Sequence, residues 1–352
     1  MKQARLRPHL TPEFVARAIG RSIPQLKEPE DFRDQIPFVD VTSDSRVVKR
    51  GSLFVALAGE TSDGHDFIEE AIRKGARGIL HRRNFKTTPQ ADVIFFPVDD
   101  TLTAYRDVAA AWRREFSLPV IAVAGSVGKT TTKEILAAIL RGKFTEILKT
   151  EGSQNGYLGI PLTLLKLHSQ HQVAVIEVGI DEIGAMEKHM TLVSPNHSLL
   201  TRVGPEHLEK LQDVPTVAHE EGLALSMVAK NGGSVVINLD DPWIRPHMAT
   251  LRGTKRVGFT LQGVPSSAPE DTNASVLSAT WKNDRKDALV FSGLDVSKME
   301  IKLPLPGVHN GSNLAAAVGV ALMLGLTETE IQKGVALFKG ATGRSELADL
   351  QG

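Results

Sequence analysis

One segment near the middle of the chain combines the residue types that hold a triphosphate. The apolar run VIAVA at 120–124 is followed directly by GSVGKTTT at 125–132. Glycines let backbone N–H groups turn toward an anion, and the helix expected from Lys129 adds positive potential at its start. Lys129 can neutralise phosphate charge, and the Thr130 hydroxyl can coordinate Mg²⁺. The residues expected to bind the nucleotide here are Gly125, Ser126, Gly128, Lys129, Thr130 and Thr131.

The loop differs from the strict GxxxxGK[ST] pattern at its first glycine. Val123 stands in that place, so the motif is the shorter GxxGKT. A chance glycine turn before a helix is the alternative interpretation. Strand, loop, Lys-Thr pair and helix all agree, which favours binding of a nucleoside triphosphate such as ATP.

Two further segments end apolar runs with groups that can bind a metal. Glu177 ends VAVIEV at 173–178, and His207 lies in RVGPEHLE after the expected strand 198–203. Parallel sheets place ligand-binding groups at the carboxyl ends of their strands, and Mg²⁺ prefers oxygen ligands. Thr130, Glu177 and His207 are therefore candidate metal ligands, with His207 alternatively a general base. The simpler interpretations are a solvated acid at Glu177 and a surface histidine at His207.

The elements that position these residues follow from the hydrophobic pattern. Thr11-Pro12-Glu13 has the form of an N-cap followed by proline at the first turn of a helix. Before Ser117 we expect strands at 52–58, 78–80 and 93–98 and helices at 65–75 and 102–116. After it we expect strands at 120–124, 173–178, 198–203 and 234–238, an antiparallel edge within 262–303, and helices at 129–141, 310–324 and 328–338. Continuous apolar strands between helices predict an α/β fold with a mainly parallel sheet.

Length and composition exclude several classes of protein. The 352 residues suggest two to three domains, and 41 Lys plus Arg balance 41 Asp plus Glu. A neutral chain lacks the basic field of a nucleic-acid or anionic-membrane binder. The chain has no cysteine, which excludes disulfides, Cys-held clusters and a thiol nucleophile. No signal peptide and no apolar run of membrane-spanning length is found, so we expect a cytoplasmic protein. We also expect a monomer whose partners are small-molecule substrates, with no nucleic acid and no membrane.

Five ordered motifs resemble the Mur ligase family, and within it the MurF group. TSDSR at 42–46, with GSLFVALAG at 51–59 and DGHDF at 63–67, is similar to the module that binds the UDP-sugar. GSVGKTTTKE at 125–134 resembles the family's phosphate loop. The segment at 150–165, the Glu177 and His207 segments, and the stretch from Pro306 with Gly343-Arg344 complete the resemblance.

The resemblance assigns roles to individual residues. It implies Ser45 and Arg46 as substrate contacts, Asn155 near nucleotide and metal, His309, Asn310 and Asn313 near the adenine, and Arg344 near the phosphates. The expected fold is a small N-terminal α/β UDP-substrate domain at 1–116, followed by a P-loop-type central ATP-binding domain at 117–343. Residues 344–352 are expected to begin a C-terminal domain that is absent.

The resemblance also implies a reaction. ATP and Mg²⁺ would convert the carboxylate of UDP-N-acetylmuramoyl-tripeptide into an acyl phosphate, with Lys129 and Arg344 offsetting the repulsion between the two anions. The amine of D-alanyl-D-alanine would then attack that carbonyl and expel phosphate, leaving an amide. The alternatives are another Mur-type ligase, MurE-like or folate-related, and a non-catalytic protein that binds nucleotide or UDP-sugar.

Several positions depart from the MurF pattern. Glu221 lies fourteen positions after His207, where MurF-like chains carry a lysine that becomes carbamylated. Glutamate supplies the same charge on a shorter stem, so we expect it either to replace that group or to be a plain acid on a helix surface. Ser153 and Gly156 stand where asparagine is usual, and Glu206 replaces an alanine.

Overall fold

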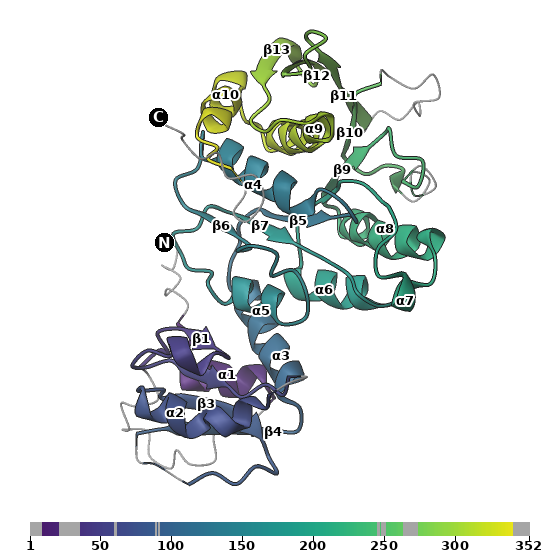
Figure 1. Ribbon diagram of the computed structural model, residues 1–352. Helices are drawn as coiled ribbons and strands as arrows, with labels where there is room; N and C mark the ends of the chain where they lie inside the picture. The colour runs from purple at the N-terminus through teal and green to yellow at the C-terminus, as the bar shows by residue number, and fades with distance from the viewer. Residues whose placement is uncertain are drawn as a thin grey trace, which may run out of the picture. The chain divides into compact units, whose positions relative to one another are not determined.

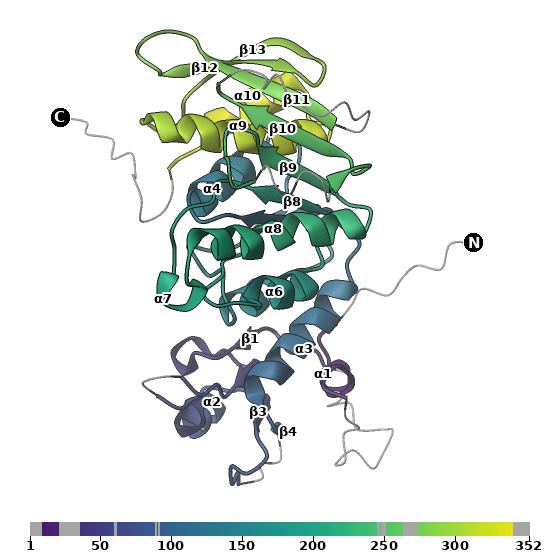
Figure 2. The ribbon, with the colours of Figure 1, turned by 90° about the vertical axis from the view of Figure 1, so that its right-hand side faces the viewer.

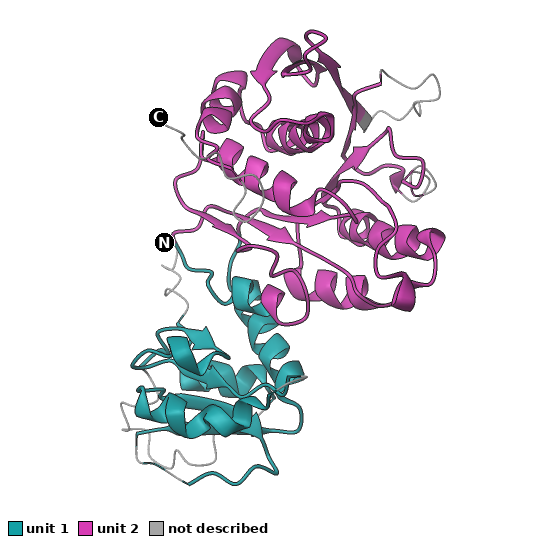
Figure 3. Cartoon of the chain, in the orientation of Figure 1, with its two compact units in different colours: residues 1–117, 161–169 teal, residues 118–160, 170–352 magenta. Residues whose placement is uncertain are grey.

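The computed structural model describes residues 9–20, 36–59, 62–88, 90, 92–244, 247, 251–262 and 274–340. The chain divides into two compact units, drawn in different colours in Figure 3. Unit 1 contains residues 1–117 and 161–169, and unit 2 contains residues 118–160 and 170–352.

Unit 1 is built on a four-stranded parallel sheet in the order β1-β2-β3-β4. The strands are β1 (Val41–Thr42), β2 (Leu53–Val55), β3 (Gly78–Arg82) and β4 (Ile94–Val98). The helices are α1 (Pro12–Ala18), α2 (Ile68–Arg73) and α3 (Thr101–Arg114), with short 3-10 turns η2 (Ser45–Val47) and η3 (Gly64–Phe67). The strands expected before Ser117 appear as β2, β3 and β4, and the expected helices appear as α1, α2 and α3, whereas the sequence did not predict β1 or η2.

Local chemistry explains where α1 begins and how it packs. The Thr11 hydroxyl accepts a hydrogen bond from Phe14 N, and Pro12 occupies the first turn, as predicted. The Phe14 ring meets Trp112 of α3 edge to face at 5.5 Å between centroids. Trp112 Nε1 donates to Leu167 O at 3.1 Å. This bond helps to explain why residues 161–169 belong to unit 1, which no sequence pattern indicated.

Unit 2 contains a nine-stranded sheet in the order β13-β12-β11-β10-β9-β8-β5-β7-β6. The strands are β5 (Val120–Ala124), β6 (Ile147–Lys149), β7 (Val173–Glu177), β8 (His197–Leu200), β9 (Ser234–Asn238), β10 (Arg256–Thr260), β11 (Ala274–Trp281), β12 (Ala288–Gly293) and β13 (Val296–Lys302). Pairing is parallel from β6 to β11 and antiparallel for β11–β12 and β12–β13. The mainly parallel sheet with an antiparallel edge is therefore confirmed.

Helices cover both faces of this sheet, as Figures 1 and 2 show. One face carries α4 (Lys129–Leu140), α9 (Val308–Met323) and α10 (Glu328–Ala336), and the other carries α6 (Ala185–Val193) and α8 (Val214–Lys230). The shorter helices α5 (Gly159–Leu164) and α7 (Leu208–Leu211) lie in connections. No helix in the described part of the chain is both long and apolar enough to cross a membrane.

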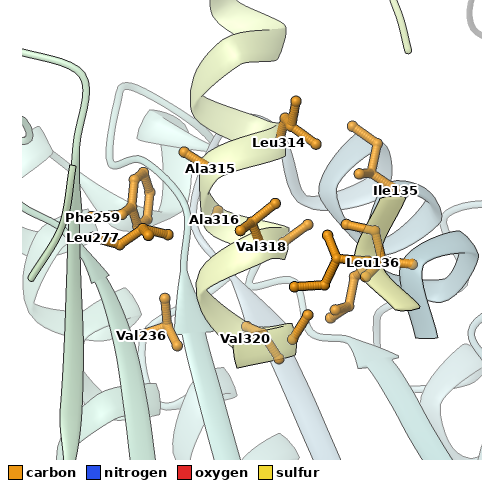
Figure 4. Close-up of a cluster of buried hydrophobic side chains, with 14 of the residues drawn as sticks. Ile135, Leu136, Val236, Phe259, Leu277, Leu314, Ala315, Ala316, Val318 and Val320 are labelled. Atoms are coloured by element: carbon orange, nitrogen blue, oxygen red, sulfur yellow. The ribbon is translucent and has the colours of Figure 1, made fainter. Parts of the chain in front are cut away.

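The core of unit 2 lies between the sheet and the pair α4 and α9. Figure 4 shows Leu314, Val318 and Val320 of α9 among Ile135 and Leu136 of α4 and the strand residues Val236, Phe259 and Leu277. All of these side chains are buried. Each fully buried aliphatic or aromatic side chain contributes about 1.5–3 kcal/mol relative to exposure. This packing fixes the start of α4 and the start of α9 against the same sheet edge.

That edge collects the segments that follow the parallel strands. Gly125 follows β5, Glu177 ends β7, Thr201 follows β8 and Asn238 ends β9. Because neighbouring parallel strands end at one edge, residues far apart in sequence meet there.

Candidate functional site

The loop between β5 and α4 has a backbone that requires two glycines. Gly125 has φ +117° and Gly128 has φ +92°, a region that other residues rarely adopt. A Cβ at Gly125 would clash with the Thr201 hydroxyl, and one at Gly128 would clash with the Asn313 side chain. The glycines predicted from the sequence therefore serve both the turn and the close packing of the loop against neighbouring segments.

Neighbouring chain segments hold this loop in place. The Thr201 hydroxyl lies 2.8 Å from Val127 O and 3.1 Å from Ala124 O, and can donate to either. Ser126 N donates to Arg202 O at 2.7 Å, and the Ser126 hydroxyl accepts from Gly204 N at 3.0 Å. The predicted residue Ser126 thus ties the loop to the segment after β8 through both its backbone and its side chain.

Lys129 at the start of α4 faces two carboxylates. Its Nζ lies 3.3 Å from Glu206 Oε2 and 4.0 Å from Glu221 Oε1, and its side chain is 11% exposed. Glu221 Oε2 accepts a hydrogen bond from Gly125 N at 2.7 Å. Acidic side chains therefore contact the loop at the lysine and at the first glycine.

The structure corrects one interpretation of Glu221. Its side chain is completely buried and accepts the hydrogen bond from Gly125 in the loop between β5 and α4, so it is not a plain acid on a helix surface. Burial, opposed by Lys129 and reinforced by Glu206, raises the pKa of Glu221 to about 8. A protonated Glu221 is therefore the favoured form near neutral pH.

A second cluster surrounds Glu177 at the end of β7. Glu177 Oε1 accepts from the Thr130 hydroxyl at 3.0 Å and from Asn155 Nδ2 at 2.8 Å. The hydroxyls of Thr130 and Ser153 lie 3.3 Å apart. Lys133 Nζ lies 3.2 Å from Glu177 Oε2. The structure therefore brings together Thr130, Asn155 and Glu177.

This donor set fits Mg²⁺ that arrives with a nucleotide. The hydroxyl and carboxylate oxygens of Thr130 and Glu177 are hard ligands, and Mg²⁺ takes its remaining ligands from phosphates and water. Among the described residues, no group of three or more His, Asp or Glu side chains is arranged to hold a metal by itself. These residues therefore fit a metal ion that is coordinated by both protein and phosphate oxygens, rather than one coordinated by protein side chains alone.

His207 stands outside this cluster. It caps α7 with φ +47°, its side chain is 48% exposed, and its Nδ1 lies 3.6 Å from Glu209 Oε1. The contacts of Glu177 that the structure shows are with Thr130, Asn155, Lys133 and Thr150. His207 as a metal ligand therefore stays a prediction.

A pocket of about 570 Å³ opens beside the loop in unit 2. Its wall includes the predicted residues Gly128, Thr131, His309, Asn310 and Asn313. Asn313 Oδ1 accepts from the Thr132 hydroxyl at 3.2 Å, and Asn313 Nδ2 donates to Asn310 Oδ1 at 3.0 Å. The bond from Thr132 links the first turn of α4 to the start of α9, and the bond between the two asparagines lies within α9. The other lining residues are Val127, Thr201, Arg202, Asn238, Asp240, Asp241, Pro242, Leu261, Gln262, Trp281, Leu305, Val308 and Ser312.

The predicted substrate residues lie in unit 1. The Ser45 hydroxyl donates to Glu70 Oε2 at 2.9 Å and is buried. The Arg46 side chain is 83% exposed and pairs with Asp44 at 2.8 Å. Hydrogen bonds from Arg46 lower the pKa of Asp44 to about 2. Arg344, predicted near the phosphates, lies outside the described residues.

Sequence reasoning missed the partners of these residues. Thr201, which anchors the loop, follows β8, but the strand expected at 198–203 placed it inside the strand rather than at its end. Glu206 was noted only as a departure from a pattern, although it contacts Lys129. Lys133 was noted only as part of a motif, although it is buried against Glu177. Long-range pairing of this kind leaves no periodic signal in the sequence.

Comparisons with known proteins identify the family to which the chain is similar. The Mur ligase middle domain matches residues 123–321, and the catalytic domain of the Mur ligase family matches residues 38–113. UDP-N-acetylmuramoyl-tripeptide--D-alanyl-D-alanine ligase of Synechocystis sp. is 33% identical over 316 residues, which are 89% of this chain and 65% of that protein. The chain therefore spans slightly less than two thirds of the length of this relative.

Solved structures of Mur ligases are similar to this chain in fold. A crystal structure of MurF from Acinetobacter baumannii has a TM-score of 0.77 and 26% identity, covering 96% of this chain and 70% of that one. MurF from Thermotoga maritima in complex with ADP has a TM-score of 0.67 and 28% identity, covering 82% and 64%. Since the middle-domain match alone spans more than half of the chain, this chain belongs to the Mur ligase family.

Proposed function

We propose that this chain carries the nucleotide and UDP-substrate machinery of a cytoplasmic, ATP-dependent amide ligase of peptidoglycan precursor synthesis. The proposed reaction joins D-alanyl-D-alanine to UDP-N-acetylmuramoyl-tripeptide. The observation that carries the proposal is the Gly125–Thr132 segment, which contains Lys129 and whose Thr130 hydroxyl is hydrogen-bonded to Glu177. The relatives that bear this activity in their names support the choice of substrates.

The pocket beside the loop supports a nucleotide as one substrate. Its volume of about 570 Å³ lies within the range of roughly 300–1,000 Å³ usual for small-molecule sites. The loop and the start of α4 would receive the phosphates. Trp281, Leu261 and Leu305 supply an apolar wall for a base, and Asn310 and Asn313 supply polar groups at the start of α9. The Thermotoga maritima relative solved with ADP supports this assignment.

The chemistry requires one anion to attack another. A substrate carboxylate attacks the γ-phosphate of ATP, which yields an acyl phosphate and ADP. Lys129 offsets the charge of the transferring phosphoryl group, and the same role is proposed for Arg344. Thr130 and Glu177 would hold Mg²⁺, with His207 as a further proposed ligand, and the ion would neutralise phosphate charge.

The second half of the reaction forms the amide. The amine of D-alanyl-D-alanine attacks the acyl phosphate carbonyl, passes through a tetrahedral intermediate and expels phosphate. No covalent enzyme intermediate is needed, so positioning and electrostatics supply the catalysis. In unit 1 the exposed Arg46 is the proposed contact for the UDP-sugar, and Ser45 supports the η2 turn through Glu70. The chain is proposed to act as a monomer.

A phosphate-release assay tests this proposal. The chain is incubated with ATP, Mg²⁺ and UDP-N-acetylmuramoyl-tripeptide, with and without D-alanyl-D-alanine. Release that requires both the tripeptide and the dipeptide supports the proposed substrates. A MurE-like ligase would instead respond to UDP-N-acetylmuramoyl-dipeptide with a single amino acid, and a non-catalytic homologue would bind nucleotide without releasing phosphate in any mixture.

A further inference from the structure

Lys133 is a completely buried cation in the second turn of α4. Its side chain is 0% exposed, and burying an ammonium group is costly unless it is paired and hydrogen-bonded. Its Nζ is paired with Glu177 Oε2 at 3.2 Å and with Glu134 Oε1 at 3.4 Å, and it donates to Gly152 O. The proposed reaction assigns no role to the Lys133 ammonium group.

The two oxygens of Glu177 have different partners. Oε2 faces Lys133, while Oε1 receives the Thr130 hydroxyl and Asn155 Nδ2. Lys133 thus sets the orientation of the carboxylate and leaves a single oxygen toward the phosphate loop. The hydrogen bond to Gly152 O also ties down the segment that carries Ser153 and Asn155.

We propose that Lys133 is a positioning residue that acts as a resident cation. It neutralises Glu177 before any metal arrives, so that Mg²⁺ enters this site only together with the phosphates of a nucleotide. A second cation beside Glu177 must overcome repulsion from the ammonium, and the negative phosphates supply the attraction that the neutralised carboxylate lacks. This inference rests on the proposed function for its ligand, a magnesium nucleotide.

The surrounding charges support this reading. Glu134, the other carboxylate beside Lys133, is also paired with Lys149 of β6, whose side chain is 28% exposed. Lys149 therefore shares the carboxylate of Glu134 with Lys133 but is more exposed. The contacts that the structure shows for Lys149 do not include Glu177. It serves as a matched control, because its removal alters the same Glu134 but leaves the Lys133–Glu177 pair in place.

The experiment measures Mn²⁺ binding by electron paramagnetic resonance, with and without a non-hydrolysable ATP analogue. For the wild-type chain we expect negligible binding of Mn²⁺ alone and clear binding once the analogue is present. Lys133→Met is expected to strengthen binding of Mn²⁺ alone by about tenfold or more, because the buried carboxylate loses its cation. Lys149→Met is expected to leave both titrations unchanged.

Two outcomes overturn the proposal. One is tight binding of Mn²⁺ alone by the wild-type chain that Glu177→Gln abolishes. The other is a folded Lys133→Met chain whose affinity for Mn²⁺ alone equals that of the wild type. If Lys133→Met does not fold, tight binding of Mn²⁺ alone by the wild-type chain that Glu177→Gln abolishes would still overturn the proposal.

A double variant tests whether the effect of Lys133 on Mn²⁺ binding acts through Glu177 rather than through the stability of the fold. Lys133→Met combined with Glu177→Gln removes both buried charges, and we expect a folded chain that does not bind Mn²⁺ alone. Retention of the gain in this double variant would contradict the role of Glu177. Failure of the wild-type chain to bind the ATP analogue at all would contradict the proposed function, whereas a gain for Mn²⁺ alone in Lys133→Met would still support the resident cation.

Discussion

Lys129 lies beside two carboxylates, and in the proposed function its ammonium group binds the phosphates of the nucleotide. Glu206 contacts its ammonium at 3.3 Å, and the buried Glu221 lies 4.0 Å away. Because burial favours the protonated form of Glu221, one negative charge is largely removed from the loop. In the proposed function, an incoming phosphate would then compete mainly with Glu206 for Lys129.

Removal of Lys129 tests this competition. We expect Lys129→Ala to weaken binding of Mg-ATP by about a hundredfold, in line with the roughly 1.5–3 kcal/mol of a hydrogen bond to a charged group. Titration calorimetry measures the change. Lys230→Ala, at the exposed end of α8, is the control and should bind ATP as the wild type does. Equal affinity of Lys129→Ala and wild type would contradict the assignment of the loop.

The buried Glu221 predicts a dependence of stability on pH. Its pKa rises from 4.5 to about 8 on folding, so between these values the folded chain retains a proton that the unfolded chain has lost. The contribution to the free energy of unfolding is therefore complete below about pH 4.5 and is lost as pH rises toward 8, with a slope of at most about 1.4 kcal/mol per pH unit.

Urea denaturation between pH 5 and 9 measures this slope. Glu221→Gln should flatten the profile, because the amide cannot titrate. Glu220→Gln is a matched control on the same helix, since Glu220 is also buried and also accepts a backbone N–H, from Gly184 at 3.0 Å. An unchanged slope in Glu221→Gln would show that another group carries the pH dependence.

At the scale of elements, the site depends on how α4 begins. Gly128 caps α4 in the left-handed region, and its missing side chain leaves room for Asn313 at the start of α9. Two helices therefore meet around one residue without a Cβ. We expect the shape of the loop to depend on this close approach.

Two alanine substitutions separate the stability cost of backbone strain from the cost of a clash with Asn313. Gly184 also caps a helix, α6, with φ +80°, but nothing lies within 4 Å of an added Cβ. Gly184→Ala should cost about 1–2 kcal/mol of stability from backbone strain alone. Gly128→Ala should cost more and should also weaken ATP binding, because Asn313 must move. Thermal unfolding and calorimetry measure both effects, and equal losses in the two variants would argue against the packing role.

Local pattern predicts many of the elements, but it does not predict β1, β6, β10, α6 or α8, nor the contacts between distant elements. The strands β5, β7 and β9 are apolar runs, and the expected helix at 129–141 is α4 with its end one residue earlier. The loop glycines follow from their need for positive φ. The pairing of Lys133 with Glu177 could not be predicted, because it joins a helix to a strand end 44 residues away, and charge alone does not select a partner.

At the scale of the whole molecule, the sequence predicted an α/β fold with a mainly parallel central sheet, and the structure confirms both. It could not place residues 161–169 with unit 1, because that assignment depends on contacts such as the one between Trp112 and Leu167 O. Nor does a sequence pattern predict that the side chains of Glu206 and Glu221 contact the loop between β5 and α4. Tertiary contacts between distant segments set these details.

The two units should respond to different ligands. Hydrogen exchange with a non-hydrolysable ATP analogue and Mg²⁺ should slow in residues 123–134 and 305–315 of unit 2, because bound ligand stabilises the segments that contact it. UDP-N-acetylmuramoyl-tripeptide should slow exchange in residues 41–67 of unit 1. Mass spectrometry of peptides from each unit reads out both effects. Protection by the nucleotide confined to unit 1 would contradict the assignment of the phosphate loop.

Trapping of the acyl phosphate tests the central claim most directly. Hydroxylamine added to the chain with ATP, Mg²⁺ and UDP-N-acetylmuramoyl-tripeptide should yield a hydroxamate of the tripeptide, together with one ADP for each hydroxamate. The yield should vanish without ATP and in Lys129→Ala. Consumption of ATP in the presence of the tripeptide with no hydroxamate formed would contradict activation of the carboxylate at this site.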